Sequence, residues 1–220
     1  MSLRDELQDL VDRFEQMPGT EDVRAVMRRG DQDVAASGVA ERALRAGARA
    51  PRFTLPDAAG KPVALDGLLA AGPVVLTFYR GAWCPYCNLT LRALQQHHDA
   101  ITARGARLVA VSPQIADESL TLAEKHELAF DVLSDVGAEV AGQYGLAFEL
   151  SAELAGLYDR LGFDLARVNG GHARTLPIPA TYVIDGAGVI RWAFADSDYK
   201  VRAEPSDIVA ALDQVVAASV

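Results

Sequence analysis

The fold can be inferred outward from one stretch of the chain, Val74-Val75-Leu76-Thr77-Phe78-Tyr79-Arg80-Gly81-Ala82-Trp83-Cys84-Pro85-Tyr86-Cys87. Its first six residues are mostly apolar and rich in β-branched and aromatic side chains, which predicts a buried strand. Pro85 suits the first position of a helix, because proline lacks an N–H that would be unpaired there anyway. A helical pattern then continues to Arg104-Gly105. The stretch therefore predicts a strand, a short loop and a helix, with two cysteines where the helix begins.

Further strand and helix patterns follow on both sides of this stretch. Residues 108–111 form a second buried-strand pattern and residues 116–128 a helical one. This alternating order predicts an α/β fold, in which helices cover a sheet. Turn residues between short apolar runs also predict two hairpins, which pair residues 53–55 with 63–65 and residues 180–184 with 189–194. A last helix is expected from about Pro205.

The residues before this domain have a helical character. Residues 3–16 place apolar side chains at helical spacing and are followed by Pro18-Gly19, which predicts an amphipathic helix. A second helical stretch, roughly residues 21–44, is punctuated by Gly30 and Gly38.

We therefore divide the chain into a helical extension, residues 1–46, and a domain, residues 47–220. The boundary lies before Pro51, where the helical spacing of apolar residues ends and short apolar runs separated by turn residues begin. The apolar stripe of the first helix must cover either the protein's own core or a second subunit. A homodimer is therefore one expectation.

Composition excludes several classes of protein. Half of the 220 residues are apolar and 23% are charged, which is typical of a folded globular protein. The formal net charge of −9 disfavours a nucleic-acid partner. The longest uncharged apolar run, roughly residues 68–79, is too short to span a bilayer, so no membrane association is expected. The first residues, Met1-Ser2-Leu3-Arg4-Asp5-Glu6, include acidic side chains where a secretory signal would have a basic and then an apolar stretch, so we expect a cytoplasmic protein.

Cys84 and Cys87 are the candidate catalytic residues. A thiol reacts as its thiolate, and an ordinary cysteine with a pKa of about 8.5 is mostly protonated at neutral pH. Because Cys84 immediately precedes the predicted helix, the unpaired N–H groups and positive end of that helix should stabilise its thiolate. Cys87 lies three residues later and within reach of a disulfide. We expect Cys84 to attack an oxidised substrate and Cys87 to attack the resulting intermediate.

Two other interpretations of the cysteines remain open at this point. Buried cysteines often serve only as small apolar core residues. A zinc site needs four ligands, yet the chain has no second Cys-x-x-Cys, and His98 would lie about 16 Å from Cys87 along one continuous helix. We therefore expect no metal and no other cofactor.

The stretch around the cysteines resembles the active-site segment of the thioredoxin superfamily, in which Trp-Cys-x-x-Cys follows a central strand. The segment from Gly47 to Asp57 resembles the start of the peroxiredoxin domain of the alkyl hydroperoxide reductase and thiol-specific antioxidant family. Residues 109–112, 130–135 and 179–191 also fit that family. The resemblance spans roughly residues 47–216. It implies a thioredoxin-like fold, with a central mixed sheet flanked by helices.

The resemblance also implies a reaction. Cys84 would be the cysteine that attacks a peroxide, Cys87 the cysteine that resolves the intermediate, and thioredoxin or another small dithiol the reductant. The expected function is thus a thiol-dependent peroxidase for hydrogen peroxide or organic hydroperoxides. The alternatives are a protein disulfide reductase, which the Cys-x-x-Cys spacing favours, and a redox sensor that switches a surface formed by the N-terminal helices.

The chain departs from the family at three positions. Members carry a threonine or serine three residues before the attacking cysteine and a proline seven before it, where this chain has Gly81 and Thr77. Their arginine before the late strand aligns with Pro179, which instead is similar to the cis-proline that faces the dithiol in thioredoxins. The sequence therefore predicts a cis bond between Ile178 and Pro179.

Two residues beside the cysteines are candidates for supporting roles. Arg80 is either a solvated loop charge or a substitute for the missing donors that stabilises the thiolate and holds a substrate oxygen. Trp83 is expected to pack beside the dithiol and to contact partner proteins. Arg191, on the late hairpin, is expected to make a cross-strand surface contact instead of serving the site. The acidic residues Asp196, Asp198 and Glu204 are interpreted as a solvated loop.

Overall fold

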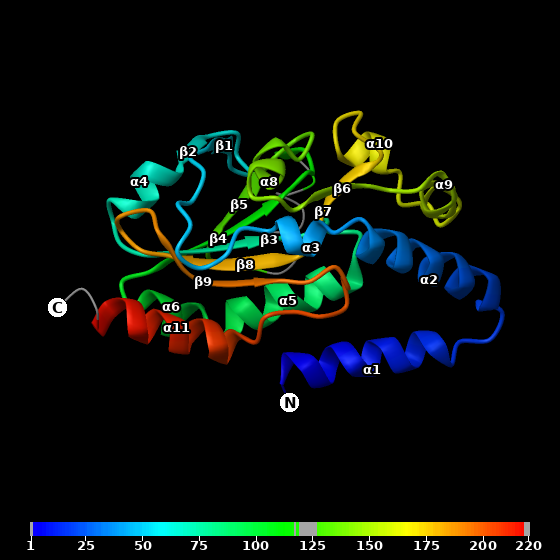
Figure 1. Cartoon of the computed structure of the whole chain (residues 1–220), viewed down its shortest axis with the longest axis horizontal. Coiled ribbons are helices and arrows are strands. Elements are labelled where there is room, and N and C mark those ends of the chain that lie inside the picture. The colour runs from blue at the N-terminus through cyan, green and yellow to red at the C-terminus, as the bar shows by residue number, and fades with distance from the viewer. Residues whose placement is uncertain (1, 117, 119–126, 218–220) are drawn as a thin grey trace.

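The structure is a computed structural model that describes residues 2–116, 118 and 127–217. A five-stranded mixed sheet forms its centre, with strand order β5-β4-β3-β8-β9 (Figure 1). Strand β3 is parallel to β4, which is parallel to β5, whereas β8 is antiparallel to both β3 and β9. The bounds of the strands are β3 Val74–Phe78, β4 Arg107–Ser112, β5 Asp131–Ser134, β8 Ala180–Ile184 and β9 Ile190–Ala195. The predicted α/β fold with a central mixed sheet is confirmed.

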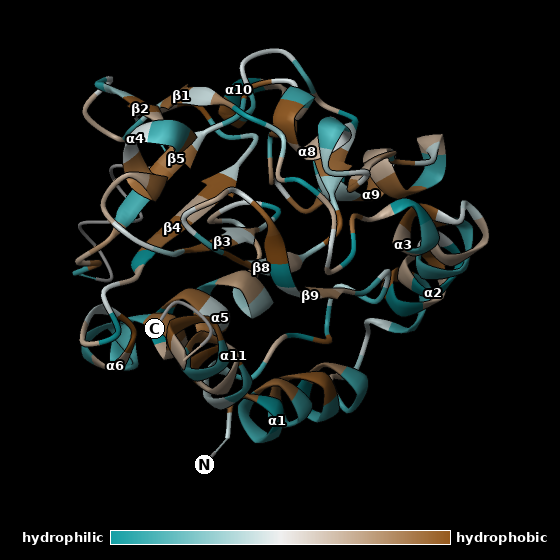
Figure 2. Ribbon diagram, turned by 60° about the vertical axis from the view of Figure 1, so that its left-hand side comes forward, coloured by the Kyte–Doolittle hydropathy of each residue, from teal (hydrophilic) through white to brown (hydrophobic). Residues whose placement is uncertain are grey.

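Helices cover the two faces of this sheet (Figures 1 and 2). One face packs against four helices, which are α1 Leu3–Glu15, α5 Pro85–Gln96, α6 His98–Thr102 and α11 Pro205–Ala217. The opposite face is covered by the helices α3 Val39–Arg42, α4 Leu65–Leu69 and α8 Glu139–Gln143 and by a small hairpin of β1 Thr54–Pro56 and β2 Pro62–Ala64. Both hairpins expected from the sequence are confirmed.

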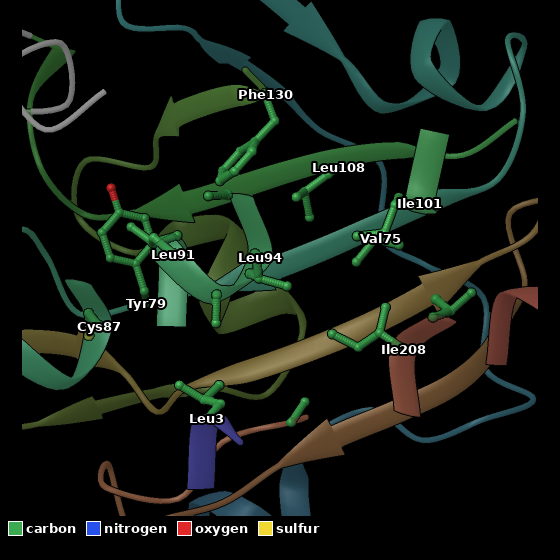
Figure 3. Packing of buried hydrophobic residues seen from close by; sticks show 14 of the residues in the cluster. Leu3, Val75, Tyr79, Cys87, Leu91, Leu94, Ile101, Leu108, Phe130 and Ile208 are labelled. Carbon is green, nitrogen blue, oxygen red and sulfur yellow. The ribbon is translucent and has the colours of Figure 1, made fainter. Parts of the chain in front are cut away.

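Strand β3 is buried along its whole length because both of its faces are covered. Val75 contributes to the apolar cluster under α5 and α11, whereas Leu76 and Phe78 contribute to the cluster on the other face. This division follows from the alternation of side chains along a strand. Figure 3 shows the first cluster, in which Leu3 of α1 and Ile208 of α11 meet the core beneath β3. The buried strand fixes the position of the loop that carries the cysteines.

The first helix confirms the amphipathic pattern of residues 3–16. Ser2 caps α1 by accepting the N–H of Asp5, and the Asp5 carboxylate accepts the N–H of Ser2 in return. Leu3 and Leu7 are buried in the cluster that also contains Cys87. The apolar stripe of α1 therefore covers the protein's own core, at least in its first turns.

The second helical stretch divides into two helices at Gly38. Helix α2, Glu21–Ala36, ends before Gly38, whose φ of +67° starts α3 from the left-handed region. Gly30 instead lies within α2 against α9, Ala152–Arg160. A Cβ at this position would lie 2.5 Å from Cδ2 of Leu154, so the glycine lets the two helices approach closely.

One of the two helices expected after the cysteines differs from the sequence interpretation, and the other is not tested. The single helix expected from Pro85 to Arg104 is broken at His97, where Nδ1 hydrogen-bonds the carbonyl of Ala93 (2.9 Å) and the N–H donates to Leu94 O (3.1 Å). In an unbroken helix, the backbone N–H of His97 would donate to the carbonyl of Ala93. Here the His97 ring nitrogen bonds that carbonyl instead. The helix expected at residues 116–128 lies mostly outside the described residues.

The segment between β5 and β8 carried no assignment from the sequence. It forms α8, α9 and three further elements, which are β6 Ala147–Glu149, α10 Leu165–Val168 and β7 Thr175–Pro177. Strands β6 and β7 pair antiparallel outside the main sheet. Among all the described helices, none is long and apolar enough to cross a bilayer.

Candidate active site

The two cysteines lie where α5 begins. Cys84 is the residue that precedes the helix, and Pro85 occupies the first helical position, as expected. The N–H of Cys84 donates to Gly81 O (3.1 Å), and its carbonyl accepts the N–H of Asn88 (3.2 Å). Both cysteines are buried and not bridged to each other. Their side chains hydrogen-bond each other, so they are placed for a joint reaction.

Burial and nearby cations have opposite effects on the charge of the pair. No N–H of the helix caps the Cys84 side chain, and burial together with the hydrogen bond to Cys87 raises the pKa of Cys84 well above its ordinary value. Burial also opposes the thiolate of Cys87. It is outweighed there by the Cys84 hydrogen bond and by the charges of Arg202 and Arg80, so the pKa of Cys87 is lowered. The charges of Arg80 and Arg202 lower the pKa of both thiols against the effect of burial, so which of the two cysteines reacts as the thiolate stays a prediction.

Arg202 is a site residue that the sequence analysis missed. Its Nη2 lies 3.6 Å from Sγ of Cys87, and its Nη1 donates to the carbonyl oxygens of Tyr199 and Val201. It comes from the segment between β9 and α11, which was interpreted as a solvated acidic loop. No spacing pattern in the sequence links it to the cysteines, because only the fold brings this segment against the start of α5.

Arg80 is a buried residue of the site and not a solvated loop charge. Only 3% of its surface is exposed, and its guanidinium lies over the rings of Tyr199 (4.3 Å), Trp83 (4.8 Å) and Tyr158 (5.5 Å). Its Nη2 also donates to the Tyr158 hydroxyl. Burial disfavours its charge, but Tyr158, the two cysteines and Tyr199 together raise its pKa. Arg80 is thus a fixed cation beside the dithiol.

Trp83 packs beside the dithiol, as the sequence suggested. Its ring lies 5.4 Å from that of Tyr158 and 5.1 Å from that of Phe163. Both partners belong to the region of α9 and its following turn, which carried no assignment from the sequence. The expected contact of Trp83 with partner proteins stays a prediction.

The backbone explains why the family hydroxyl is absent at position 81. Gly81 has a φ of +144°, and a Cβ there would lie 2.5 Å from Nε1 of Trp83. A threonine would therefore be strained and would collide with Trp83. Thr77 does not compensate, because its hydroxyl bonds Thr181 Oγ1 (3.0 Å) inside the sheet.

The expected cis bond before Pro179 is wrong: the described residues contain no cis peptide bond. Pro179 is buried between β7 and β8 and lines a small cavity with Arg80, Tyr158 and Tyr199. The carbonyl of Pro179 accepts the N–H of Asp196 as the chain enters β8. The ordinary trans bond suits this extended path, and the similarity to the thioredoxin cis-proline is thereby weakened.

The segment that carries Arg202 is held by the N-terminal helices. Nζ of Lys200 lies 2.7 Å from Asp31 of α2 and 2.8 Å from Asp198. The Glu204 carboxylate accepts the N–H groups of Leu3 and Arg4 at the start of α1 (3.3 and 2.7 Å). Residues interpreted as a solvated loop therefore position the cation beside Cys87.

Cys84 also lines a cavity of about 320 Å³, which we call the dithiol cavity. Its walls come from α1, α2, the start of α5, the α9 region and the segment after β9. The lining residues are Leu10, Phe14, Met17, Thr20, Val23, Met27, Arg80, Trp83, Cys84, Pro85, Tyr86, Tyr158, Leu161, Phe163 and Tyr199. Cys84 is thus the sulfur that a bound small molecule meets.

Other candidates lie away from this site. Arg191 pairs with Asp185 across the β8–β9 hairpin (2.6 Å), as expected. The described residues include no group of three or more His, Cys, Asp or Glu side chains arranged to hold a metal ion.

Comparisons with known proteins agree with this fold. The model of the AhpC/TSA family matches residues 46–193. Chloroplastic peroxiredoxin Q of Sedum lineare is 28% identical over 148 residues, which is 67% of each chain. Peroxiredoxin Bcp of Escherichia coli is 32% identical over 108 residues, which is 49% of this chain and 69% of that protein.

A solved structure shows the same fold. Peroxidoxin BcpB from Mycobacterium tuberculosis superimposes with a TM-score of 0.62 at 23% identity, covering 78% of this chain and 98% of that one. The matched region spans 55 to 67% of the length of the chloroplastic peroxiredoxin Q relatives. Since the family model matches most of the chain, including the strand, loop and helix that carry the dithiol, this protein belongs to the AhpC/TSA family and is a peroxiredoxin-like member of the thioredoxin superfamily.

Proposed function

We propose that this protein is a thiol-dependent peroxidase that reduces hydrogen peroxide or organic hydroperoxides with the dithiol Cys84–Cys87. One observation carries the proposal: the two hydrogen-bonded cysteines are buried next to Arg80 and Arg202, and Cys84 lines a cavity large enough for a small substrate. Membership of the AhpC/TSA family supports the same reaction.

The first step takes place at Cys84. Cys84 releases its proton to solvent to form a thiolate, which the charges of Arg80 and Arg202 favour, and the sulfur attacks the terminal oxygen of the peroxide. The sulfur–oxygen bond forms as the oxygen–oxygen bond breaks. Cys84 becomes a sulfenic acid, and the leaving oxygen takes a proton from solvent to give an alcohol, or water when the substrate is hydrogen peroxide.

The second step closes the disulfide. The Cys87 sulfur attacks the sulfenic sulfur of Cys84, and the hydroxyl group departs as water with the Cys87 proton. Thioredoxin or another small dithiol then supplies two electrons and two protons to restore both thiols.

The two arginines act in both steps. A cation near a sulfur favours its thiolate and offsets the negative charge that develops on the departing oxygen. Arg202 is in contact with Cys87, while Arg80 lies over the rings of Trp83 and Tyr199 near Cys84. We propose that Arg80 supplies the electrostatic support that the family obtains from the residues absent at positions 81 and 179.

The alternative is a protein disulfide reductase, which the Cys-x-x-Cys spacing favours. Such a reductase must bring its attacking sulfur to a disulfide on another protein. Only 1% of the Cys84 surface is exposed, and the sulfur is enclosed by the walls of the dithiol cavity. A small peroxide can enter this cavity directly, whereas a protein substrate, or thioredoxin acting as the reductant, would first have to displace part of the cavity wall. The reductant, cytosolic residence and a homodimer stay predictions.

Stopped-flow fluorescence of the reduced protein tests the reaction class. We expect peroxide to oxidise it orders of magnitude faster than it oxidises free cysteine, and faster than an oxidised protein substrate does. Cys84→Ser should abolish the reaction, whereas Cys87→Ser should accumulate a sulfenic acid that mass spectrometry detects after trapping.

Full peroxidase turnover in Cys84→Ser would overturn the assignment of Cys84. A faster reaction with the protein disulfide would favour the reductase instead. Oxidation that changes only the elution volume in size-exclusion chromatography, without turnover, would favour the redox sensor.

A further inference from the structure

The dithiol cavity is built from two parts of the chain that lie far apart in sequence. The thioredoxin-like domain supplies Cys84, Arg80 and an aromatic wall. The N-terminal helices supply the facing wall, which consists of Leu10, Phe14, Met17, Thr20, Val23 and Met27. The family model begins at residue 46, so this second wall lies outside the region that the chain shares with the family.

The cavity is too large and too apolar for hydrogen peroxide alone. Its volume of about 320 Å³ holds roughly ten groups of the size of a water molecule, at about 30 Å³ each. Five of the six side chains of the N-terminal wall are hydrocarbon, aromatic or thioether, so a small polar molecule there finds few hydrogen-bond partners. Met17 and Leu161 are 49% and 41% exposed, which leaves an apolar rim open to solvent.

The polar groups are concentrated near the sulfur. Arg80 and Trp83 both line the cavity, and each keeps a buried N–H group, Nε and Nε1 respectively, for which the described residues offer no acceptor. Both nitrogen atoms are themselves out of contact with solvent, so what the cavity offers a bound peroxide oxygen is the positive charge of Arg80. The cavity therefore combines a reactive sulfur and a nearby cation with a hydrocarbon-lined remainder.

We propose that the N-terminal helices of this protein complete a binding site for the apolar tail of an organic hydroperoxide, so that bulky hydroperoxides are preferred to hydrogen peroxide. The peroxide oxygens lie at Cys84, and the tail lies against α1 and α2. This inference rests on the proposed peroxidase function and adds the substrate class. The extension, in this view, is a specificity element of the active site.

Rates with cumene hydroperoxide and hydrogen peroxide test the preference in the full-length protein. We expect cumene hydroperoxide to oxidise the reduced enzyme at least about tenfold faster, because apolar groups of this size contribute strongly in a matched pocket. Val23→Phe, which fills the cavity from α2, should lower the ratio of the two rates by about tenfold. Phe14→Ala removes a ring from the wall without crowding and should lower the ratio in the same direction.

Val216→Phe is the matched control, because Val216 is exposed on α11 and does not line the cavity. The ratio in this variant should stay within about twofold of the parent. A faster reaction with hydrogen peroxide in the parent, or an unchanged ratio in a folded Val23→Phe protein, would overturn the proposal.

A binding measurement separates this inference from the proposed function. The unreactive alcohol 2-phenyl-2-propanol should change the tryptophan fluorescence of Cys84→Ser saturably, because Trp83 lines the cavity. The change should weaken when Val23→Phe is added. Saturable binding without any peroxide reaction would support the apolar binding site but reject the peroxidase function. Peroxidase activity without binding of the alcohol, and without a preference for cumene hydroperoxide, would reject the apolar binding site alone.

Discussion

Arg202 reaches the sulfur of Cys87 from a position 115 residues further along the chain. Its guanidinium and that of Arg80 oppose the effect of burial, which by itself would keep both thiols protonated. At the residue scale, then, the reactivity of the dithiol depends on cations placed by tertiary structure more than on the start of α5. The helix end still positions the sulfurs, since Cys84 and Pro85 take the positions expected for them.

Arg202→Met should move the pH dependence of the reaction upward. Because the Arg202 charge lowers the pKa of Cys87, its removal should raise the pH at which the thiolate forms, by about one pH unit or more. The reaction should therefore slow most at low pH and recover as the pH rises. The ultraviolet absorbance of the thiolate and the rate of peroxide oxidation, both followed against pH, measure this.

Arg191→Met is the control for this substitution, since Arg191 pairs with Asp185 on the hairpin and has no described contact with the sulfurs. Its titration midpoint should match that of the parent protein. An unchanged midpoint in Arg202→Met would show that Arg202 has no electrostatic role at Cys87.

At the scale of elements, the segment between β9 and α11 is held from both sides. Asp31 of α2 pairs with Lys200, and Glu204 accepts two N–H groups at the start of α1. The N-terminal helices therefore fix the segment that presents Tyr199 to Arg80 and Arg202 to Cys87.

A double-mutant cycle on Asp31 and Lys200 tests this connection. Asp31→Asn, Lys200→Met and the double variant should give a coupling energy of about 0.5 to 1 kcal/mol, because the pair is partly buried but still reaches solvent. Urea unfolding measures it. The same cycle on the exposed pair Arg52 and Asp66 should give a value near zero. Equal coupling in the two pairs would mean that Lys200 does not anchor the segment to α2.

At the scale of the whole molecule, α1 is part of the central core. Leu3 and Leu7 share one apolar cluster with Cys87, Leu91 and Ile208 (Figure 3). Helix α2 is joined to α9 by the close approach at Gly30 and by the ion pair of Arg29 with Glu153. The N-terminal helices should therefore unfold together with the domain instead of separately.

Leu7→Ala should destabilise the whole protein. The side chain is 4% exposed, and loss of a buried leucine leaves a cavity that costs about 2 to 4 kcal/mol. Tryptophan fluorescence and far-ultraviolet circular dichroism should report one shared transition in urea, at a lower midpoint than in the parent. Val216→Ala, at an exposed position, should change stability by less than about 0.5 kcal/mol. Two separate transitions would show that α1 folds independently of the core.

Much of this architecture follows from local patterns in the sequence. The buried strand at residues 74–78, the proline at the first helical position and the late hairpin all depend on interactions between near neighbours, and the structure has them as expected. The resemblance to the thioredoxin superfamily placed the two cysteines after the central strand. The break at His97 was missed because it depends on one side-chain hydrogen bond to Ala93.

The sequence by itself determined the sheet, the amphipathic first helix and the pair of cysteines at the start of α5, since periodicity and turn residues encode them locally. Only the tertiary structure decided that Arg80 is buried, that Arg202 is a neighbour of Cys87 and that α1 and α2 line the dithiol cavity. These features depend on burial and on charges brought together across more than a hundred residues, and no local pattern carries that information.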